Sequence, residues 1–388
     1  MKIAVTGPIA IDALHPYLNT KTTAPFHGSG GASISNLIIG LLELGQNVSA
    51  YALDPNIENE VILKGDNLTI YIGKYRRRGR DRMKDFFEFE SRQIRDFIVK
   101  DKPDIVNAHW SYEFAIGAIR SGYPHLITFR DHAWTVVKYY KDHYRFLRFL
   151  MDRYVRVRGS NFSVNSFYLY NKIGIKKNCE IIPNPILEKF IRYNPKKILE
   201  QPIKIISILN GYSDRKNPKK ALKAFHILCN SHPGIKFTYH IYGQGYEENG
   251  QAYQWAKDNN LLSGVELKGR IPHAELMEQI TSYDLLFHPS KEESFGNIII
   301  EAMANGLPVV GGEKSGAVPW LLKDGEYGIL TDIEDENTIA GDIFSLINDK
   351  DKYFEYSEKG FDYVKNNFSS KNIAEKYLER YTRILSRP

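Results

Sequence analysis

Cysteine and long apolar runs are both scarce in this 388-residue sequence. Cys179 and Cys229 are the two cysteines, too few for a disulfide framework, and this usage is typical of a reducing compartment. No run approaches the roughly 20 apolar residues of a membrane-spanning helix. The first residues lead directly into an expected strand, not into a secretory signal. We therefore expect a cytoplasmic protein without membrane spans.

A strong excess of one charge is also missing, since 52 Lys and Arg stand against 46 Asp and Glu, for a net charge of +6. No nucleic-acid-binding motif is present, so we expect no nucleic acid as a partner. Zinc-ligand spacing, a Walker loop and a serine elbow are absent as well. The Asp-x-Asp at Asp349 and Asp351 follows no expected strand and is interpreted as surface. We expect neither a bound metal nor a cofactor.

Short apolar runs alternate with helical patterns along the whole chain, which is typical of a doubly wound α/β fold. The length fits two or three domains, and a new strand–helix series begins after residue 200, so we place the boundary near residue 190. The expected strands are 2–6, 48–53, 68–72, 104–109, 125–130 and 161–165 in the first half, and 203–209, 236–242, 265–268, 285–288, 307–310 and 328–331 in the second.

Residues 284–312 contain the densest set of functional signals in the sequence. A buried strand at 285–288 is followed by a polar loop that carries Glu292 and Glu293, and then by a helix over 298–304 that contains Glu301. In open α/β sheets, ligands bind in the crevice at the carboxyl ends of strands, next to helix N-termini. The pattern therefore predicts a ligand site here.

The spacing Glu293-x7-Glu301, with Phe295-Gly296 between the two acids, resembles the retaining glycosyltransferases of family four, which have the GT-B fold. The resemblance implies that Glu301 binds the hydroxyls of the donor ribose and that Glu293 approaches the hydroxyls of the donor sugar. It also implies that the loop of Phe295, Gly296 and Asn297 directs its amides at the donor diphosphate.

Other donor contacts follow from the same resemblance. Arg215 and Lys216 precede a helix, where the family places a basic pair that neutralises the departing diphosphate. The loops with Gly243 and with Arg270-Ile271 surround the nucleobase in the family.

The first half adds two further candidates. Gly28, Gly30 and Gly31 precede an apolar helix pattern, where a glycine loop of the family meets the donor phosphate. His109 ends a buried strand, where members of the family carry a histidine near the donor sugar. With Lys216 and Glu293, His109 completes the expected catalytic set.

The resemblance implies two Rossmann-like domains that face a cleft, an acceptor-side domain at 1–190 and a nucleotide-sugar domain at 191–370, with a final helix at about 371–388 packing back on the first. The implied function is metal-independent, retaining transfer of a sugar from a nucleotide-diphosphate donor to a glycan or lipid-linked acceptor, in cell-surface polysaccharide or glycolipid synthesis. Two alternatives are a nucleotide-sugar epimerase of the same fold and a non-catalytic protein that binds nucleotide sugars or polyanions.

Two basic stretches indicate a surface for anionic lipid at the inner face of a membrane. Residues 74–84 hold seven basic residues and one acidic residue. Residues 138–158 hold seven basic and two acidic residues, interleaved with aromatics. The second stretch is interpreted as one basic amphipathic helix. A solvated face and core packing of the aromatics are the simpler explanations.

Overall fold

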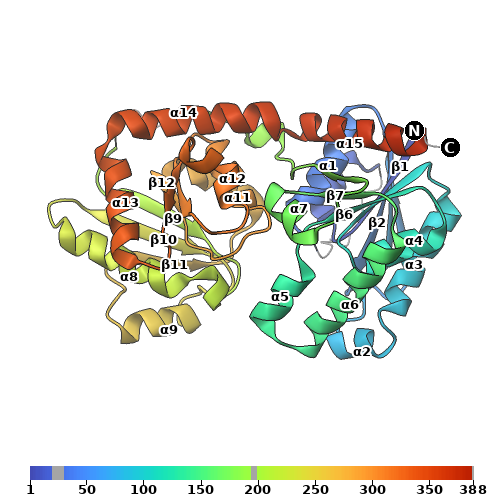
Figure 1. Ribbon diagram of the computed structural model, residues 1–388, viewed down its shortest axis with the longest axis horizontal. Coiled ribbons are helices and arrows are strands. Elements are labelled where there is room, and N and C mark those ends of the chain that lie inside the picture. Colours follow the sequence, from blue (N-terminus) through green and yellow to red (C-terminus); the bar gives the residue numbers. More distant parts are fainter. Residues whose placement is uncertain (20–29, 194–198, 387–388) are drawn as a thin grey trace. The chain divides into compact units, whose positions relative to one another are not determined.

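The computed structural model describes residues 1–19, 30–193 and 199–386, and it divides into two compact units. Unit 1 comprises Met1–Leu187 and Ser369–Pro388, and unit 2 comprises Glu188–Phe368. Figure 1 shows that each unit contains its own sheet with helices packed around it. The fold is α/β with two parallel-sheet domains, as the alternation of strand and helix patterns predicts.

Unit 1 is built on an eight-stranded sheet with the order β3-β4-β2-β1-β5-β6-β7-β8. Neighbouring strands are parallel except for β3, which runs antiparallel to β4 at the edge. The strands are β1 Lys2–Thr6, β2 Asn47–Asp54, β3 Val61–Lys64, β4 Leu68–Lys74, β5 Ile105–His109, β6 His125–Phe129, β7 Phe162–Val164 and β8 Cys179–Ile181.

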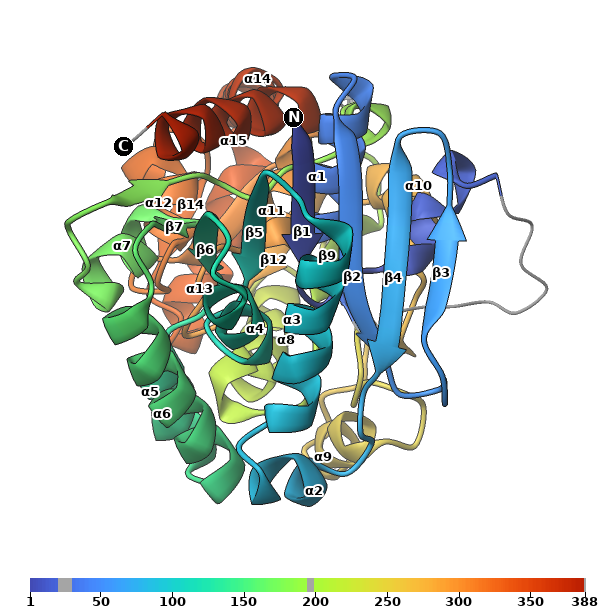
Figure 2. The same cartoon turned by 90° about the vertical axis from the view of Figure 1, so that its right-hand side faces the viewer.

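The helices of unit 1 cover its sheet, and Figure 2 shows α3 and α4 in front of the strands. Residues of α3, α4 and α6 share one apolar core with alternate residues of the strands. The helices are α1 Ala32–Glu43, α2 Gly79–Lys84, α3 Glu88–Asp101, α4 Glu113–Ser121, α5 Ala133–Tyr140, α6 His143–Arg158, α7 Phe167–Ile173 and α15 Ser370–Leu385, with a short 3-10 helix at Ile11–Tyr17.

The last helix, α15, belongs to unit 1 although it follows unit 2 in the chain. It packs on α1, where Gly40 lies directly against the backbone of Ser370. Asn107 of β5 donates to the hydroxyl of Tyr381 at 2.7 Å, which ties α15 to the middle of the sheet. The C-terminal residues therefore support the strand that ends at His109.

Unit 2 is built on a fully parallel six-stranded sheet with the order β11-β10-β9-β12-β13-β14. Its elements are β9 Ile203–Ile208, α8 Pro218–Ser231, β10 Phe237–Tyr242, α9 Gln251–Asp258, β11 Val265–Gly269, α10 His273–Gln279, β12 Leu285–His288, α11 Asn297–Met303, β13 Val309–Gly312, α12 Val318–Leu321, β14 Ile329–Thr331, α13 Glu336–Asn348 and α14 Lys350–Asn367, with 3-10 helices at Glu188–Phe190, Asp214–Lys216, Ile280–Ser282 and Lys323–Gly325.

Each sheet has a point where the strand order reverses. In unit 1 the chain moves outward in opposite directions from β1 and β5, and in unit 2 it does so from β9 and β12. The loops after these strands diverge, which leaves a crevice at the carboxyl edge of the sheet, the usual ligand position in this class of fold. The loops after β9 and β12 carry the candidate donor residues, and His109 ends β5.

Two details differ from the sequence-based expectation. The edge strand β3 was not predicted, because four residues with an exposed outer face give little periodicity. The basic stretch at 138–158 is not one helix, because Lys141 adopts a left-handed backbone with φ of 50° and ends α5. Asp142 then caps α6 by accepting the amide of Arg145 at 2.8 Å.

Candidate functional site

Lys216 and Glu293 meet at the point of strand-order reversal in unit 2. Lys216 ends the 3-10 turn after β9, and Glu293 lies in the loop between β12 and α11. The Lys216 ammonium donates directly to Oε1 of Glu293, and both side chains are largely buried. The two loops that sequence analysis singled out therefore come together through these two residues.

His288, the last residue of β12, is a third member of this group. Its Nε2 lies 3.4 Å from the same oxygen of Glu293. Burial acts to raise the pKa of Glu293, but the charge of Lys216 and the contact with His288 outweigh burial, so the pKa lies well below the ordinary value. Glu293 is therefore a carboxylate at working pH, able to accept hydrogen bonds but not to supply a proton.

Arg215 and Glu292 form a second pair beside the first. The Arg215 guanidinium donates to the carbonyl of Glu292 at 3.2 Å and to its carboxylate at 3.4 Å. Burial raises the pKa of Glu292, and Arg215 opposes that effect. Arg215 thus lies next to Lys216, as expected, but its side chain is directed at a carboxylate of the neighbouring loop.

Glu301 lies on α11 with its carboxylate close to His273 of α10. His273 Nε2 is 2.8 Å from Oε1 of Glu301, and the ring of Phe190 contacts the imidazole edge-on at 5.4 Å between ring centres. Burial lowers the pKa of His273, but the hydrogen bond and charge of Glu301 raise it above the ordinary value overall. A ligand hydroxyl that approaches Glu301 would share this carboxylate with His273.

The residues between the two glutamates have different roles. Gly296 has φ of 100° at the N-cap of α11, a conformation that favours glycine and turns the chain into the helix. Asn297 is exposed. Phe295 is buried and packs on the rings of Trp320 and Phe368, so its side chain anchors the loop in the core instead of lining a ligand site.

The loops after β10 and β11 are joined to each other. The Gly243 amide donates to the carbonyl of Gly269 at 2.7 Å, and a Cβ at Gly243 would lie 1.8 Å from the carbonyl oxygen of Leu209. Arg270 is exposed and donates to the side chain of Gln244, and Ile271 follows it partly buried. Close backbone approach therefore requires glycine at 243.

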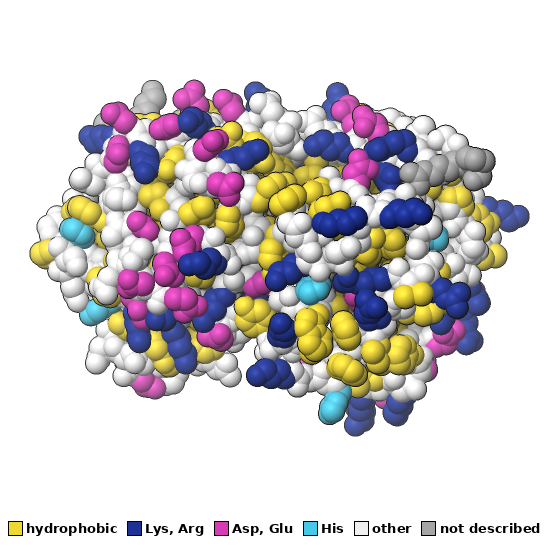
Figure 3. Space-filling model, viewed as in Figure 1, with side chains coloured by type: hydrophobic (Ala, Val, Ile, Leu, Met, Phe, Trp, Pro, Cys, Tyr) yellow, Lys and Arg dark blue, Asp and Glu magenta, His cyan; other side chains and the backbone are white. Residues whose placement is uncertain are grey.

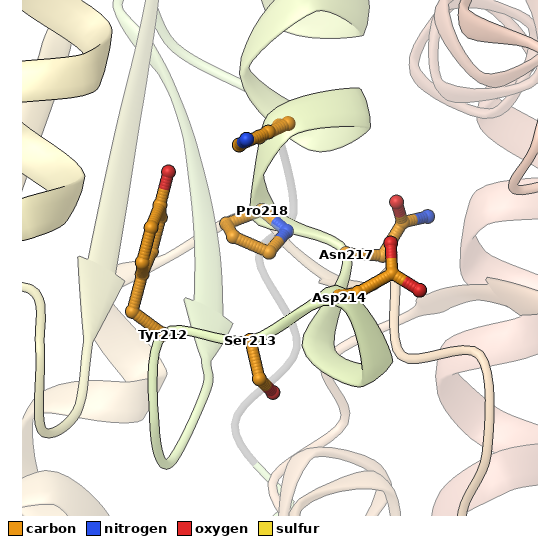
Figure 4. A pocket seen from close by; sticks show the side chains of 6 residues that line it. Tyr212, Ser213, Asp214, Asn217 and Pro218 are labelled. Atoms are coloured by element: carbon orange, nitrogen blue, oxygen red, sulfur yellow. The ribbon is translucent and has the colours of Figure 1, made fainter. Parts of the chain in front are cut away.

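A pocket of about 280 Å³ opens at the start of α8. Figure 4 shows its lining side chains, which come from the loop that carries Arg215 and Lys216 and from the first turn of the helix. The lining residues are Tyr212, Ser213, Asp214, Asn217, Pro218 and Lys219.

In unit 1, His109 lies at the other reversal point and is fully buried. Arg130, just after β6, donates to Nδ1 of His109 through Nε at 3.1 Å and Nη2 at 2.9 Å. A guanidinium can only donate, so Nδ1 must accept and Nε2 must carry the proton. Among the described residues, Nε2 has no hydrogen-bond partner. His109 therefore offers a neutral N–H donor at the carboxyl edge of the sheet.

The glycine loop of unit 1 is described only from Gly30 onward, and Gly28 lies outside the described residues. A Cβ at Gly30 would lie 1.6 Å from the carbonyl oxygen of Pro8, so the close crossing with the loop after β1 requires glycine here. Gly31 is the N-cap of α1, and a Cβ there would have open space around it.

The sequence patterns did not predict Arg130, His273 and His288 as members of these groups. His288 and Arg130 stand at or just after the ends of buried strands, which is the signal that identified His109. His273 gave no comparable signal, because its contact with Glu301 joins residues 28 positions apart on separate helices. Within the described ranges, no three His, Cys, Asp or Glu side chains are grouped so that they could hold a metal ion.

Comparison with known proteins identifies a family that matches most of unit 2. The family model for glycosyl transferases group 1 matches residues 192–362, which include Lys216, Glu293 and Glu301. Nearly all of unit 2 therefore matches the group 1 glycosyltransferases. Solved structures extend the likeness to the whole chain: sucrose-phosphate synthase from Thermosynechococcus elongatus has a TM-score of 0.77 at 17% identity and covers 100% of this chain and 99% of its own.

A second solved structure shares the fold, and two curated proteins are similar in part of their sequence. HepE from Anabaena, solved in complex with UDP and glucose, has a TM-score of 0.71 at 15% identity over 99% of this chain and 100% of its own. The lipopolysaccharide core biosynthesis glycosyltransferase LpsE of Rhizobium meliloti is 28% identical over 40% of this chain and 45% of its own length. The gpi3 subunit of the phosphatidylinositol N-acetylglucosaminyltransferase of Schizosaccharomyces pombe is 26% identical over 54% and 44%. The chain thus spans less than half the length of these two curated relatives.

Proposed function

We propose that this glycosyltransferase moves a sugar from a nucleotide-diphosphate donor to a hydroxyl of a glycan or lipid-linked acceptor, with retention of the anomeric configuration. The observation that carries the proposal is the contact of Lys216 with an ionised Glu293 at the strand reversal of unit 2, in the loop that leads into the helix of Glu301. A cation and acceptor groups at this edge suit a ligand with a diphosphate in the middle and sugar hydroxyls on either side of it.

In the proposed reaction, the bond from the anomeric carbon to the diphosphate breaks as the acceptor oxygen bonds to the same face of that carbon. The acceptor proton passes to an oxygen of the departing diphosphate, so no protein base is needed. Lys216 stabilises the charge that develops on the diphosphate, the role that a metal ion has in other transferases. Glu293 accepts hydrogen bonds from the sugar hydroxyls.

The test is incubation of the protein with a panel of nucleotide sugars and hydroxyl acceptors, followed by proton NMR of the product with and without EDTA. We expect nucleotide release, a new linkage with the donor's anomeric configuration, and a rate that EDTA leaves largely unchanged. An inverted anomeric signal would contradict retention. Loss of activity in EDTA that a divalent ion restores would contradict the metal-free reaction, and an epimerised donor without transfer would indicate the epimerase alternative.

We further propose that α5 and α6 bring the enzyme to an anionic membrane surface that carries a lipid-linked acceptor. Phe146, Leu150 and Val157 of α6 share one helix face and are 47%, 38% and 73% exposed. The ring of Phe149 contacts Phe146 at 6.2 Å and Trp134 of α5 at 5.2 Å between ring centres. Figure 3 shows apolar and basic side chains gathered over these two helices.

The charges around this surface favour an anionic partner. The two acidic residues of 138–158 are both paired: Asp142 with Arg145, and the buried Asp152 with Arg156. In the other basic stretch, Arg76 pairs with Asp85 and Glu90, so that segment has less charge to offer a membrane. We therefore assign the lipid contact to α5 and α6.

Vesicle flotation tests this surface. The double variant Phe146→Ser, Leu150→Ser should bind vesicles that contain phosphatidylglycerol less tightly than wild type, by roughly 1.5 kcal/mol or more per apolar side chain. Binding should fall as salt rises, because cations near the surface contribute about 1 kcal/mol each. Phe86→Ser is the control, since Phe86 is 48% exposed but lies outside α5 and α6. Equal binding to neutral and anionic vesicles would overturn the proposal.

Within the described ranges, no helix is long and apolar enough to span a bilayer.

A further inference from the structure

The two loops that meet at the strand reversal of unit 2 carry complementary charges in matching order. Asp214–Lys216 reads acidic, basic, basic, and residues 291–293 read basic, acidic, acidic. Each residue of the first segment pairs with the residue 77 positions later, so the pairs form a charge ladder with three rungs. The backbone adds a further link, because the amide of Lys291 donates to the carbonyl of Arg215 at 2.8 Å.

The rungs differ in burial from one end of the ladder to the other. The Asp214 side chain in the outer rung is 82% exposed, whereas the side chains of Glu292 and Lys216 in the other two rungs are each 10% exposed. An exposed ion pair contributes little to stability, while a charge left unpaired in a buried site is costly. The middle and inner rungs therefore hold the loops together, and the outer rung adds little.

In the middle rung, Arg215 balances the negative charge of Glu292, which burial and the adjacent charge of Glu293 would otherwise disfavour. Glu292 is buried, and its pKa is raised by burial and by the neighbouring charge of Glu293, while Arg215 lowers it. If Arg215 were directed away toward a ligand, two adjacent carboxylates would have Lys216 as their nearest cation. The Arg215 guanidinium therefore already has a partner within the protein, Glu292.

We propose that Arg215 and Glu292 are a positioning pair, which keeps the two loops in register so that Lys216 and Glu293, one residue further along each loop, stay opposite each other. Arg215 then acts through Glu292 and not as a ligand of the diphosphate. The roles of Lys216 and Glu293 rest on the proposed function, but the register of the loops does not. This assignment replaces the expectation, drawn from family resemblance, that Arg215 contacts the donor.

The test compares Arg215→Gln, Glu292→Gln and the charge exchange Arg215→Glu with Glu292→Arg. Hydrogen exchange of the amides in residues 210–217 and 290–296 reports the register of the loops without any ligand. Calorimetry with inorganic pyrophosphate reports the anion site. We expect both single variants to speed exchange in both loops and to weaken pyrophosphate binding about fivefold or more, as for contacting residues that are energetically coupled. The charge exchange should restore both properties at least in part.

Lys359→Gln serves as the matched control, because it removes the cation of an exposed ion pair with Glu355 on α14 of the same unit. It should leave loop exchange and pyrophosphate binding at wild-type values. The proposal is overturned if Glu292→Gln leaves loop exchange unchanged. It is also overturned if Arg215→Gln weakens pyrophosphate binding without faster exchange and the charge exchange fails to restore it, since Arg215 would then be a direct ligand. Absence of transferase activity would count against the proposed function and leave the exchange result standing.

Discussion

Burial and the adjacent guanidinium of Arg130 hold the pKa of His109 well below its ordinary value. The imidazole is therefore neutral in the folded protein over the whole physiological range, and its Nδ1 is occupied as an acceptor. A histidine in this state cannot act as a general acid through an imidazolium. It can donate one hydrogen bond from Nε2, which suits a contact with a sugar hydroxyl.

This state predicts how stability depends on pH. Below about pH 6.5 the histidine takes up a proton in the unfolded chain but not in the folded protein. The contribution of His109 to the unfolding free energy is therefore complete above that pH and declines as the pH falls. Between about pH 7.5 and pH 5.5, wild type should lose about 1.4 kcal/mol more unfolding free energy than His109→Asn, which keeps an acceptor for Arg130 but does not titrate. Urea denaturation at both pH values measures the difference, and parallel losses in the two proteins would contradict a neutral His109.

Lys216 and Glu293 predict a separation of stability from activity. Lys216→Ala leaves the buried Glu293 without its cation, which should cost about 3–5 kcal/mol of unfolding free energy, and it removes a contact to the developing charge worth about 3 kcal/mol in transfer rate. Adding Glu293→Gln should recover much of the stability but none of the rate. Thermal unfolding and steady-state kinetics on the single and double variants test this, and recovery of both quantities together would remove Lys216 from the chemistry.

At the scale of elements, helix contacts decide where glycine is required. Gly40 of α1 lies against the backbone of α15, and a Cβ there would approach the carbonyl oxygen of Ser370 to 2.4 Å. Gly341 also lies within a helix, α13, but a Cβ there would have nothing within 4 Å. The same substitution should therefore have opposite effects at the two positions.

Gly40→Ala should lower the unfolding free energy by about 1–3 kcal/mol, because two helix backbones must move apart. Gly341→Ala should raise it by up to about 1 kcal/mol, because alanine has the better helix propensity and meets no neighbour. Chemical denaturation of the two variants beside wild type measures both signs. A neutral result for Gly40→Ala would mean that α1 and α15 can separate without cost.

At the scale of the whole molecule, the residues expected to bind nucleotide are concentrated in unit 2, where Lys216, Arg270, Glu293 and Glu301 all lie. A ligand that binds the folded protein stabilises it by mass action, by about 2.7 kcal/mol at a hundredfold excess over Kd. Proteins with two units need not unfold in one step, so this gain can be confined to one of them. The nucleotide should thus protect the unit that holds its binding residues.

We expect the nucleoside diphosphate released in the transfer assay to slow hydrogen exchange more in β9 and β12 than in β2 and β4. Glu301→Ala should weaken nucleotide binding by about 1.5–3 kcal/mol, the range for hydrogen bonds to a charged group, and remove most of this protection at the same nucleotide concentration. Protection of both units to the same extent, or wild-type affinity in Glu301→Ala, would argue against the expected donor residues in unit 2.

Local patterns predicted much of the architecture, because strands and helices repeat every two and every 3.6 residues and leave a signature within a few turns. The core strands of both sheets and the helix after residue 296 were visible in this way. The short edge strand β3 was not, and neither was the break at Lys141, where one residue adopts a left-handed backbone inside a continuous amphipathic pattern.

By itself the sequence determined the α/β class, placed Lys216 and Glu293 in loops after strands and Glu301 on the following helix, and carried a spacing that resembles one family. Strand order was decided in the tertiary structure, and with it the contact between loops 77 residues apart. The same is true of the neutral state of His109, which depends on Arg130 from the next strand of the sheet. The physical reason is that pairing, burial and protonation arise from neighbours in space, and no local periodicity specifies which distant residues those will be.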